Sequence, residues 1–483
     1  MFKKALNHLF APEYLVKEKE RLGELPSTKE TYKNVMSIAT PSIAEMVLIG
    51  LIGSMDTMMV GGLGKGALAS VNLPVQPRML LLCLFFALNV GVTAIIARRR
   101  GENNRAAANA TLRNAIMLAL MVSAVFMTLA LVFTEPLMRL AGGTSDTEED
   151  AKILCDAQDY FRILTYSLPV HAVSMCICAA QRGIGNTRIT LRVNIVSNLV
   201  NVVFNYLLIG GNFGFPRLEV RGAAIASVIG MAVGAVLALM TVFFPRRDAR
   251  FLQISHRDSW RFDKDAMRAI FKVGGNAMIE QLGMRFGFFV SSRLVFGLGT
   301  TFVAAHVICS QLVGITFYFG DGLSVAATSL VGRNMGAKRS DLSMLYGKAA
   351  QRIALIISAT LGVLIVLLRY PLASLFIGAD TADAALVVQY AATTMLVIAA
   401  VQPFQISAVV VSGSLRGAGD NLYVAVAATI CISILRPGLT WLAVDWLKFG
   451  LTGTYIFMML EMVVRLAFFY PRFASGKWRK IKI

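Results

Sequence analysis

Residues 45–64 read EMVLIGLIGSMDTMMVGGLG, and residues 280–299 read EQLGMRFGFFVSSRLVFGLG. At an offset of 235 positions, Glu45 aligns with Glu280, and the Gly-Leu-Gly at 62–64 aligns with the one at 297–299. Further matches follow in the same order: Ala69 with Ala304, Gln76 with Gln311, Thr93 with Thr328, Arg98 with Arg333, Gly101 with Gly336 and, at an offset of 234, Pro169 with Pro403, Arg182-Gly183 with Arg416-Gly417 and Gly185 with Gly419. The chain is therefore an internal duplication.

The composition is typical of a membrane protein. Hydrophobic residues make up 56% of the 483 residues, and charged residues make up only 16%, too few to cover a soluble core of that size. Twelve apolar stretches are long enough to cross a bilayer core of about 30 Å, which takes roughly 20 helical residues. They cover residues 34–60, 68–97, 112–134, 158–181, 188–210, 221–244, 268–296, 302–331, 350–368, 386–411, 422–444 and 450–470. We predict an all-α polytopic membrane protein with twelve transmembrane helices in two pseudo-symmetric six-helix lobes.

The spans and the charged segments between them predict the domain boundaries. Residues 1–33 form a cytoplasmic N-terminal segment, and residues 34–244 form the first six-helix lobe. A cytoplasmic linker follows at 245–266, then the second lobe at 267–471 and a basic cytoplasmic tail at 472–483.

The net charge of +19 is unevenly distributed along the chain. If the N-terminus is inside, the loops on the inner side hold most of the basic residues, for example Arg98-Arg99-Arg100, Arg246-Arg247 with Arg250 and Arg257, and Lys477 to Lys482. The acidic loop 146–150 falls outside. This positive-inside pattern predicts a multi-pass protein of the plasma (inner) membrane with both termini in the cytoplasm. Anionic lipid headgroups suffice as partners for the basic loops, so no nucleic-acid partner is expected.

The sequence lacks the motifs of an enzyme. It has no G-x-x-x-x-G-K-[ST] loop for ATP, its six cysteines show no zinc spacing, and its four histidines are scattered. We therefore expect no cofactor and no catalytic site. A duplicated, strongly apolar chain is typical of a secondary transporter, which an ion gradient would drive.

At this point the residues resemble a known family. Pro41 to Glu45, then Ser54 to Gly64 and Ala67 to Val71, closely resemble the first helix of the multidrug and toxic compound extrusion (MATE) family, bacterial type, within the MOP flippase superfamily. Both repeats also carry an Arg-Gly-x-Gly signature, at Arg182 and at Arg416. The resemblance implies an antiporter that exports small organic, cationic or amphiphilic compounds by alternating access, in exchange for H+ or Na+, and we expect it to act as a monomer.

Asp56 is the first candidate for ion coupling, because a carboxylate within a membrane span is expensive and usually serves ions or protons. Asn194, Asn198, Asn201 and Asn205 share one face of the fifth predicted helix. They suit either an ion site or interhelical hydrogen bonds. The resemblance implies an ion site at Asp56, Asn201, Asn205 and the hydroxyl of Ser227. Family members often have Asp where Asn205 stands, so the loss of one charge favours H+ over Na+ at Asp56, Asn201 and Asn205, and no other metal is expected.

Glu45 and Glu280 are the repeat-related acids. Glu45 lies on the same helical face as Asp56, about 16 Å away along the axis, which suits a proton path. Glu280 either meets a cationic substrate or pairs with Arg285 or Arg293 on its own span, in which case its charge is structural.

The remaining substrate-cleft candidates are Met284, Gln405 and Tyr318. Met284 and Gln405 stand where the NorM-like branch is expected to carry coupling acids, so that second site is expected to be absent here, although Glu280, one turn before Met284, could substitute. Tyr318 can stack on a substrate or simply pack against its neighbours. The alternative function is a lipid-linked sugar flippase of the same superfamily, which would need several basic side chains, and Arg78, Arg285 and Arg293 are the one plausible set.

Overall fold

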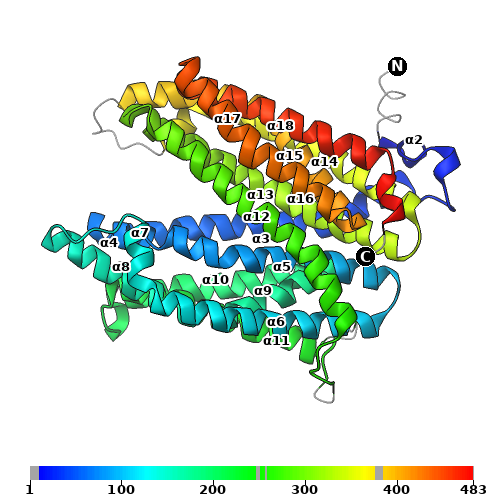
Figure 1. Cartoon of the computed structure of the whole chain (residues 1–483), viewed down its shortest axis with the longest axis horizontal. Helices are drawn as coiled ribbons and strands as arrows, with labels where there is room; N and C mark the ends of the chain where they lie inside the picture. Colours follow the sequence, from blue (N-terminus) through cyan, green and yellow to red (C-terminus); the bar gives the residue numbers. More distant parts are fainter. Residues whose placement is uncertain (1–9, 246–250, 256–257, 376–383, 482–483) are drawn as a thin grey trace. The chain divides into compact units, whose positions relative to one another are not determined.

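The computed structural model of the chain describes residues 10–245, 251–255, 258–375 and 384–481, and every regular element within them is helical (Figure 1). The chain forms two compact units. Unit 1 comprises Met1–Ile43, Gly101–Asn103 and Asn276–Ile483, and unit 2 comprises Ala44–Arg100 and Asn104–Gly275. Parts of the predicted N-terminal segment, linker and tail lie outside the described residues, and so do Arg246, Arg247, Arg250 and Arg257.

Unit 2 contains the helices of the first repeat. It holds the second part of α3 (Thr28–Gly61) and the first part of α12 (Lys264–Phe296). Between them run α4 (Lys65–Asn72), α5 (Val75–Gly101), α6 (Arg105–Val132), α7 (Thr134–Leu140), α8 (Glu148–Tyr166), α9 (Leu168–Gly183), α10 (Thr187–Gly210) and α11 (Glu219–Phe243).

Unit 1 contains the helices of the second repeat. It begins with the short α2 (Pro12–Leu15) and the first part of α3, and it resumes in the second part of α12. The other helices are α13 (Thr300–Gly336), α14 (Ser340–Ser374), α15 (Ala384–Ala418), α16 (Asn421–Thr429), α17 (Arg436–Trp441) and α18 (Gly450–Ala474).

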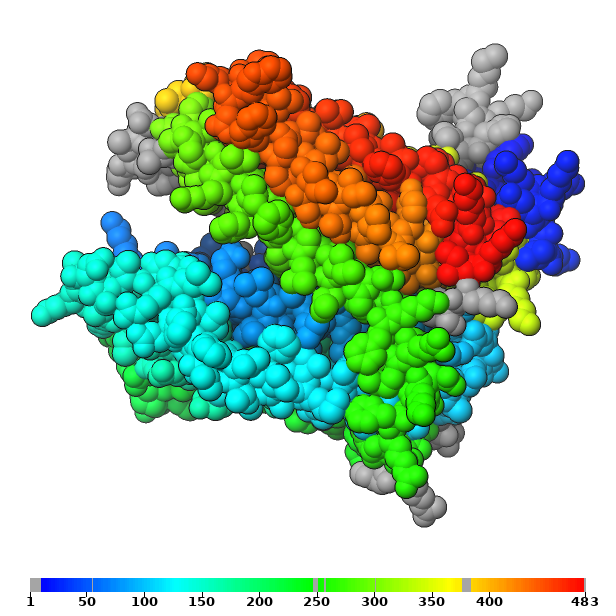
Figure 2. Space-filling model, in the orientation of Figure 1, coloured from blue at the N-terminus to red at the C-terminus, as the bar shows by residue number. Residues whose placement is uncertain are grey.

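The helices have the length and the surface of membrane spans. Within the described residues, ten helical stretches are long and apolar enough to cross a bilayer, with α4–α5 and Asn421–Trp446 each counted as one, and the number is eleven if the bent pair α8–α9 forms one span. Helix α12, which carries Glu280, Arg285 and Arg293, stands at the remaining predicted position. Figure 2 shows α6, in cyan, on the surface of its unit, where Met121, Val125 and Val132 expose apolar side chains suited to lipid. The prediction of an all-helical polytopic membrane protein is confirmed.

Three predicted spans differ from the structure because each contains a local break. The span predicted at 68–97 is two helices, α4 and α5, separated at Leu73-Pro74. The span predicted at 158–181 is bent by 51° between α8 and α9, where Pro169 has no N–H to continue the helical ladder. The span predicted at 422–444 contains two π-helical stretches, Ile430–Leu435 and Leu442–Trp446.

The two Arg-Gly-x-Gly signatures have the same structural explanation in both units. A Cβ on Gly183 would lie 2.8 Å from the backbone oxygen of Thr93, and a Cβ on Gly417 would collide with the backbone of Thr328. The two threonines, which are repeat mates, donate from Oγ1 to the backbone oxygens of Ala179 at 3.0 Å and of Gly413 at 2.8 Å. The first glycine of each signature is therefore needed for close helix packing.

The second glycine of each signature ends its helix. Gly185 has a φ of 84° and Gly419 a φ of 95°, in the left-handed region that glycine adopts most readily. The arginine of each signature forms an ion pair inside its unit, which is described with the site below.

Candidate functional site

The site in unit 2 begins with the close packing of α10 against α11. A Cβ on Gly230 would lie 2.8 Å from the backbone oxygen of Ser197, and a Cβ on Gly222 would lie 2.6 Å from that of Leu208. The hydroxyl of Ser197 also donates to the backbone oxygen of Gly230 at 2.7 Å. Small residues on α11 therefore let it approach α10, which brings Ser227 next to Asn201.

Asp56 lies one to two turns before the end of α3 and is the centre of the site. Asn205, which is buried, donates from Nδ2 to Asp56 Oδ1 at 2.6 Å. In the amide orientation that satisfies both neighbours, Asn201 donates to the same Asp56 oxygen at 2.9 Å, and its own oxygen accepts from the backbone N–H and the hydroxyl of Ser227, each at 3.2 Å. The structure thus brings together the four residues Asp56, Asn201, Asn205 and Ser227.

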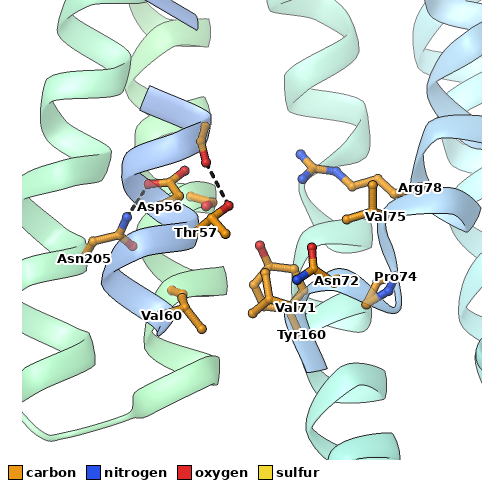
Figure 3. A pocket seen from close by; sticks show the side chains of 13 residues that line it. Asp56, Thr57, Val60, Val71, Asn72, Pro74, Val75, Arg78, Tyr160 and Asn205 are labelled. Atoms are coloured by element: carbon orange, nitrogen blue, oxygen red, sulfur yellow. Dashed lines mark hydrogen bonds between the residues drawn. The ribbon is translucent and has the colours of Figure 1, made fainter. Parts of the chain in front are cut away.

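A cavity of about 180 Å³ opens beside Asp56 (Figure 3). Helices α3, α4, α5, α8, α10 and α11 line it through Gly53, Asp56, Thr57, Val60, Val71, Asn72, Pro74, Val75, Arg78, Tyr160, Asn205, Ala223 and Ser227. The space holds several water molecules or one end of a ligand. It is smaller than the pockets of about 300 Å³ and more that enclose a drug-sized molecule.

Arg78 lies on the wall opposite Asp56 (Figure 3). Its side chain is partly buried on the first turn of α5, and its charge acts on Asp56 and on Tyr160. Within the described residues, no ion pair joins Arg78 to Asp56 at 4 Å or less. The cavity therefore holds one carboxylate and one guanidinium that face each other without direct contact.

Glu45 belongs to a different network in unit 2. Its carboxylate is buried and accepts from Arg182 Nη1 at 2.9 Å, from Thr190 Oγ1 at 2.6 Å and from Asn194 Nδ2 at 2.9 Å. Glu45 is absent from the side chains that line the Asp56 cavity. The geometry favours a fixed, ion-paired charge over the proton path expected from the sequence.

The asparagine face of α10 thus serves two carboxylates. Asn194 donates to Glu45, while Asn201 and Asn205 donate to Asp56. The spacing along α10 matches the spacing of the two acids along α3, so one helical face stabilises both.

Unit 1 contains the repeat mate of the Glu45 network. Glu280 on α12 is ion-paired with Arg416, the arginine of the second signature. The partner of Glu280 therefore comes from α15, 136 residues away, rather than from Arg285 or Arg293 as the sequence suggested. In both units, the signature arginine neutralises the buried glutamate of the first helix of the repeat.

The other cleft candidates in unit 1 are Gln405, Met284 and Tyr318. Gln405 is fully buried, and neither polar atom of its amide has a hydrogen-bond partner within the described residues. Its gap with Tyr455 and Met458 has no room for a water molecule. Met284 packs against an apolar core cluster, and Tyr318 is partly buried on α13.

Asp321 is a candidate residue that was not predicted from the sequence. This acid lies in the middle of the apolar helix α13, is partly exposed, and is acted on by the charge of Arg416. Its signal was present in the sequence, because an acid inside a membrane span is a functional candidate by default. The sequence analysis also gave no role to Tyr160, whose side chain lies in the Asp56 cavity.

Comparison with known proteins gives the class of the molecule. The family model described as MatE matches residues 41–207 and 277–442, that is, both repeats. The chain is 28% identical over 469 residues to the probable multidrug resistance protein NorM of Thermotoga maritima, covering 97% of this chain and 96% of that protein. The fold matches an outward-facing multidrug resistance MATE family transporter of the MOP superfamily, with a TM-score of 0.83, 21% identity and coverage of 92% and 97%. It also matches a MOP superfamily transporter from Pyrococcus furiosus, with a TM-score of 0.84, 20% identity and the same coverage.

The molecule is therefore a multi-pass membrane transporter and not an enzyme. It belongs to the MATE family.

Proposed function

We propose that the protein exports small organic compounds, cationic or amphiphilic, in exchange for protons, and that Asp56 binds the proton. The observation that carries the proposal is the Asp56 carboxylate in a cavity within a membrane-spanning unit, held by two amides. A substrate cation and a proton would then compete for the same negative charge, which is the requirement for exchange by alternating access.

The amide orientations support H+ over Na+ as the coupling ion. Sodium needs several oxygen ligands, but Asn201 and Asn205 both present N–H groups to Asp56 Oδ1. Arg78 on the facing wall adds a positive charge that repels a bound metal cation. A proton needs only the carboxylate oxygen.

The family match and the charge pattern support the remaining parts of the proposal. The match to the MatE model extends over both repeats, which favours efflux over the flippase alternative. The positive-inside pattern supports an orientation with both termini in the cytoplasm of the inner membrane. We propose that the protein works as a monomer, because each network described above is complete within one unit of a single chain.

Ethidium transport into everted membrane vesicles, whose lumen corresponds to the outside of the cell, measures efflux and tests the coupling ion. A pH gradient and a Na+ gradient are imposed in turn on vesicles that contain the wild-type protein. Efflux should follow the pH gradient and should persist when Na+ is removed. Loss of efflux on removal of Na+ at a constant pH gradient would overturn the assignment of H+.

The role of Asp56 is tested in the same vesicles with Asp56→Asn. This variant should abolish gradient-driven efflux while it still inserts and folds. Glu135→Gln is the matched control, because Glu135 is an exposed acid whose ion-pair partner among the described residues is Arg139 on the same helix, α7. Near-wild-type efflux by Asp56→Asn would contradict the proposed role of Asp56.

A further inference from the structure

Arg78 is a positive charge in the Asp56 cavity. In the proposed exchange, neither the exported cation nor the proton binds to it. It stands within a membrane span, where a guanidinium is costly unless a partner of opposite charge or a hydrogen-bonding group satisfies it. In the part of the chain that the structure describes, the guanidinium of Arg78 makes neither a hydrogen bond nor an ion pair within 4 Å, and only the backbone N–H of Arg78 donates, to the oxygen of Pro74 at 3.0 Å. Its side chain projects into the cavity instead (Figure 3).

The surroundings of Arg78 suit an anionic group. Tyr160 lies in the same cavity, and its hydroxyl, like the guanidinium, makes no hydrogen bond to another described residue. The break at Leu73-Pro74 makes Val75 the first residue of α5, and Val75 also lines the cavity. Two features of the cavity wall, the guanidinium of Arg78 and the hydroxyl of Tyr160, thus offer donors to an anion.

The titratable and charged groups that face Arg78 come from several helices. Asp56 on α3 and Tyr160 on α8 line the cavity with Arg78, and the charge of Arg78 acts on both and on His171 of α9. Asp56 is the sole acid among them, and two asparagine amides already hold it. Arg78 therefore keeps donors free for a second anion.

We propose that the Arg78 wall of the cavity is an anion subsite that takes the carboxylate of a zwitterionic substrate. The cationic end of the same substrate meets Asp56, and this half of the inference rests on the proposed function. A cavity of about 180 Å³ accepts the charged end groups of such a compound rather than a whole drug-sized molecule.

The competing interpretation is that Arg78 is only a counter-charge for Asp56. A counter-charge would lower the affinity for every cation and would give no gain for an added carboxylate. An anion subsite gives that gain, because a charge-assisted hydrogen bond to a guanidinium is one of the stronger polar contacts.

Measurements of direct binding to the purified protein distinguish an anion subsite from a counter-charge. Isothermal titration is performed with three small probes of one scaffold: benzylamine, 4-(aminomethyl)benzoate and benzoate. In the wild-type protein, the zwitterion should bind about tenfold or more tightly than benzylamine. Arg78→Gln should remove this advantage and leave benzylamine binding unchanged or stronger.

Two further variants keep the result interpretable. Arg78→Lys retains the charge without the planar fork and should keep part of the advantage, even if Arg78→Gln folds poorly. Arg139→Gln, which removes an exposed guanidinium on α7, should leave all three affinities unchanged.

Equal or undetectable affinity for the amine and the zwitterion in the wild-type protein would overturn the proposal. An advantage that persists in Arg78→Gln would also overturn it. The titrations are run in gluconate and repeated in chloride at equal ionic strength. Chloride that abolishes the zwitterion advantage at millimolar concentration would identify a site for an inorganic anion and would contradict the substrate role.

The same probes separate this inference from the proposed function. Asp56→Asn should weaken benzylamine binding and leave the affinity for benzoate unchanged or stronger. If Asp56→Asn leaves benzylamine unchanged while Arg78→Gln still removes the zwitterion advantage, the anion subsite stands and the role of Asp56 fails.

Discussion

Asn205 Nδ2 lies 2.6 Å from Asp56 Oδ1, and this hydrogen bond defines the chemistry of the unit 2 cavity. The amide of Asn205 is uncharged and does not neutralise Asp56. Among the side chains that line the cavity, only Asp56 and Arg78 are charged, so these two set its net charge. A second acid at position 205 would instead create a paired carboxylate site with oxygen ligands for a metal cation. If Asp56 binds the proton as proposed, we expect the residue at this position to select between a proton and a metal ion.

Asn205→Asp should convert the site toward Na+. The added carboxylate replaces an N–H donor with oxygen ligands and doubles the negative charge at Asp56. We expect efflux that is stimulated by Na+ at a constant pH gradient in everted vesicles. Asn198→Asp, on the same helix but outside the cavity lining, is the control. Efflux by Asn205→Asp that remains insensitive to Na+ would contradict this explanation of ion selectivity.

The Glu45–Arg182 pair should be necessary for stability. Arg182→Gln leaves the buried Glu45 without its counter-charge, and breaking a buried pair from one side costs about 3–5 kcal/mol. We expect a lower melting temperature and a lower yield in detergent. The double variant Glu45→Gln/Arg182→Gln should recover much of the loss, because it buries no unpaired charge. A double variant as unstable as the single one would show that the pair is not the cause.

Glu280→Gln should reduce folded protein without changing cation affinity. It leaves Arg416 without the ion-pair partner that the structure gives it. Yield and the affinity for a cationic dye are measured together on the protein that folds. Normal yield with weakened dye binding would instead restore Glu280 as a recognition residue.

The glycines of the two signatures should tolerate no side chain. Gly183→Ala and Gly417→Ala place a methyl group against the backbone of Thr93 and Thr328, and overpacking of this kind costs about 1–3 kcal/mol. Gly275→Ala is the control, because no atom lies within 4 Å of its added Cβ. Thermal melting should separate the two classes, and equal melting temperatures would refute the packing explanation.

Asp321→Asn should reduce transport with little loss of folded protein. Asp321 is a partly exposed acid in an apolar helix, and no ion pair is broken when it is neutralised within the described residues. Initial rates of dye efflux and the melting temperature are measured side by side. Full transport by this variant would show that the acid has no part in the cycle.

The sequence predicted the helical membrane fold because hydropathy over long windows depends on local composition. It also predicted that Asp56, Asn201, Asn205 and Ser227 belong together, through the face of one helix and the family resemblance. The break at Leu73-Pro74 was missed, since an apolar window does not show where a helix interrupts its own ladder.

The ion pairs Glu45–Arg182 and Glu280–Arg416 could be predicted only in part from the sequence, because they depend on how distant helices pack. Glu45 and Glu280 are repeat mates, and so are Arg182 and Arg416, so the duplication offered both pairs at once. Arg285 was the nearer partner for Glu280 in sequence, but contacts between α12 and α15 are set by packing rather than by separation along the chain. The position of Arg78 opposite Asp56 likewise depends on how α5 packs, which no local pattern reveals.

Substrate-induced proton release tests the central claim most directly. Purified wild-type protein in a weakly buffered solution receives a saturating cationic substrate, and the change in pH is recorded with a soluble indicator. If Asp56 carries the proton that the substrate displaces, the wild-type protein releases protons on binding, and Asp56→Asn releases none at equal occupancy. Equal proton release by the two proteins would contradict the assignment of Asp56 as the coupling residue.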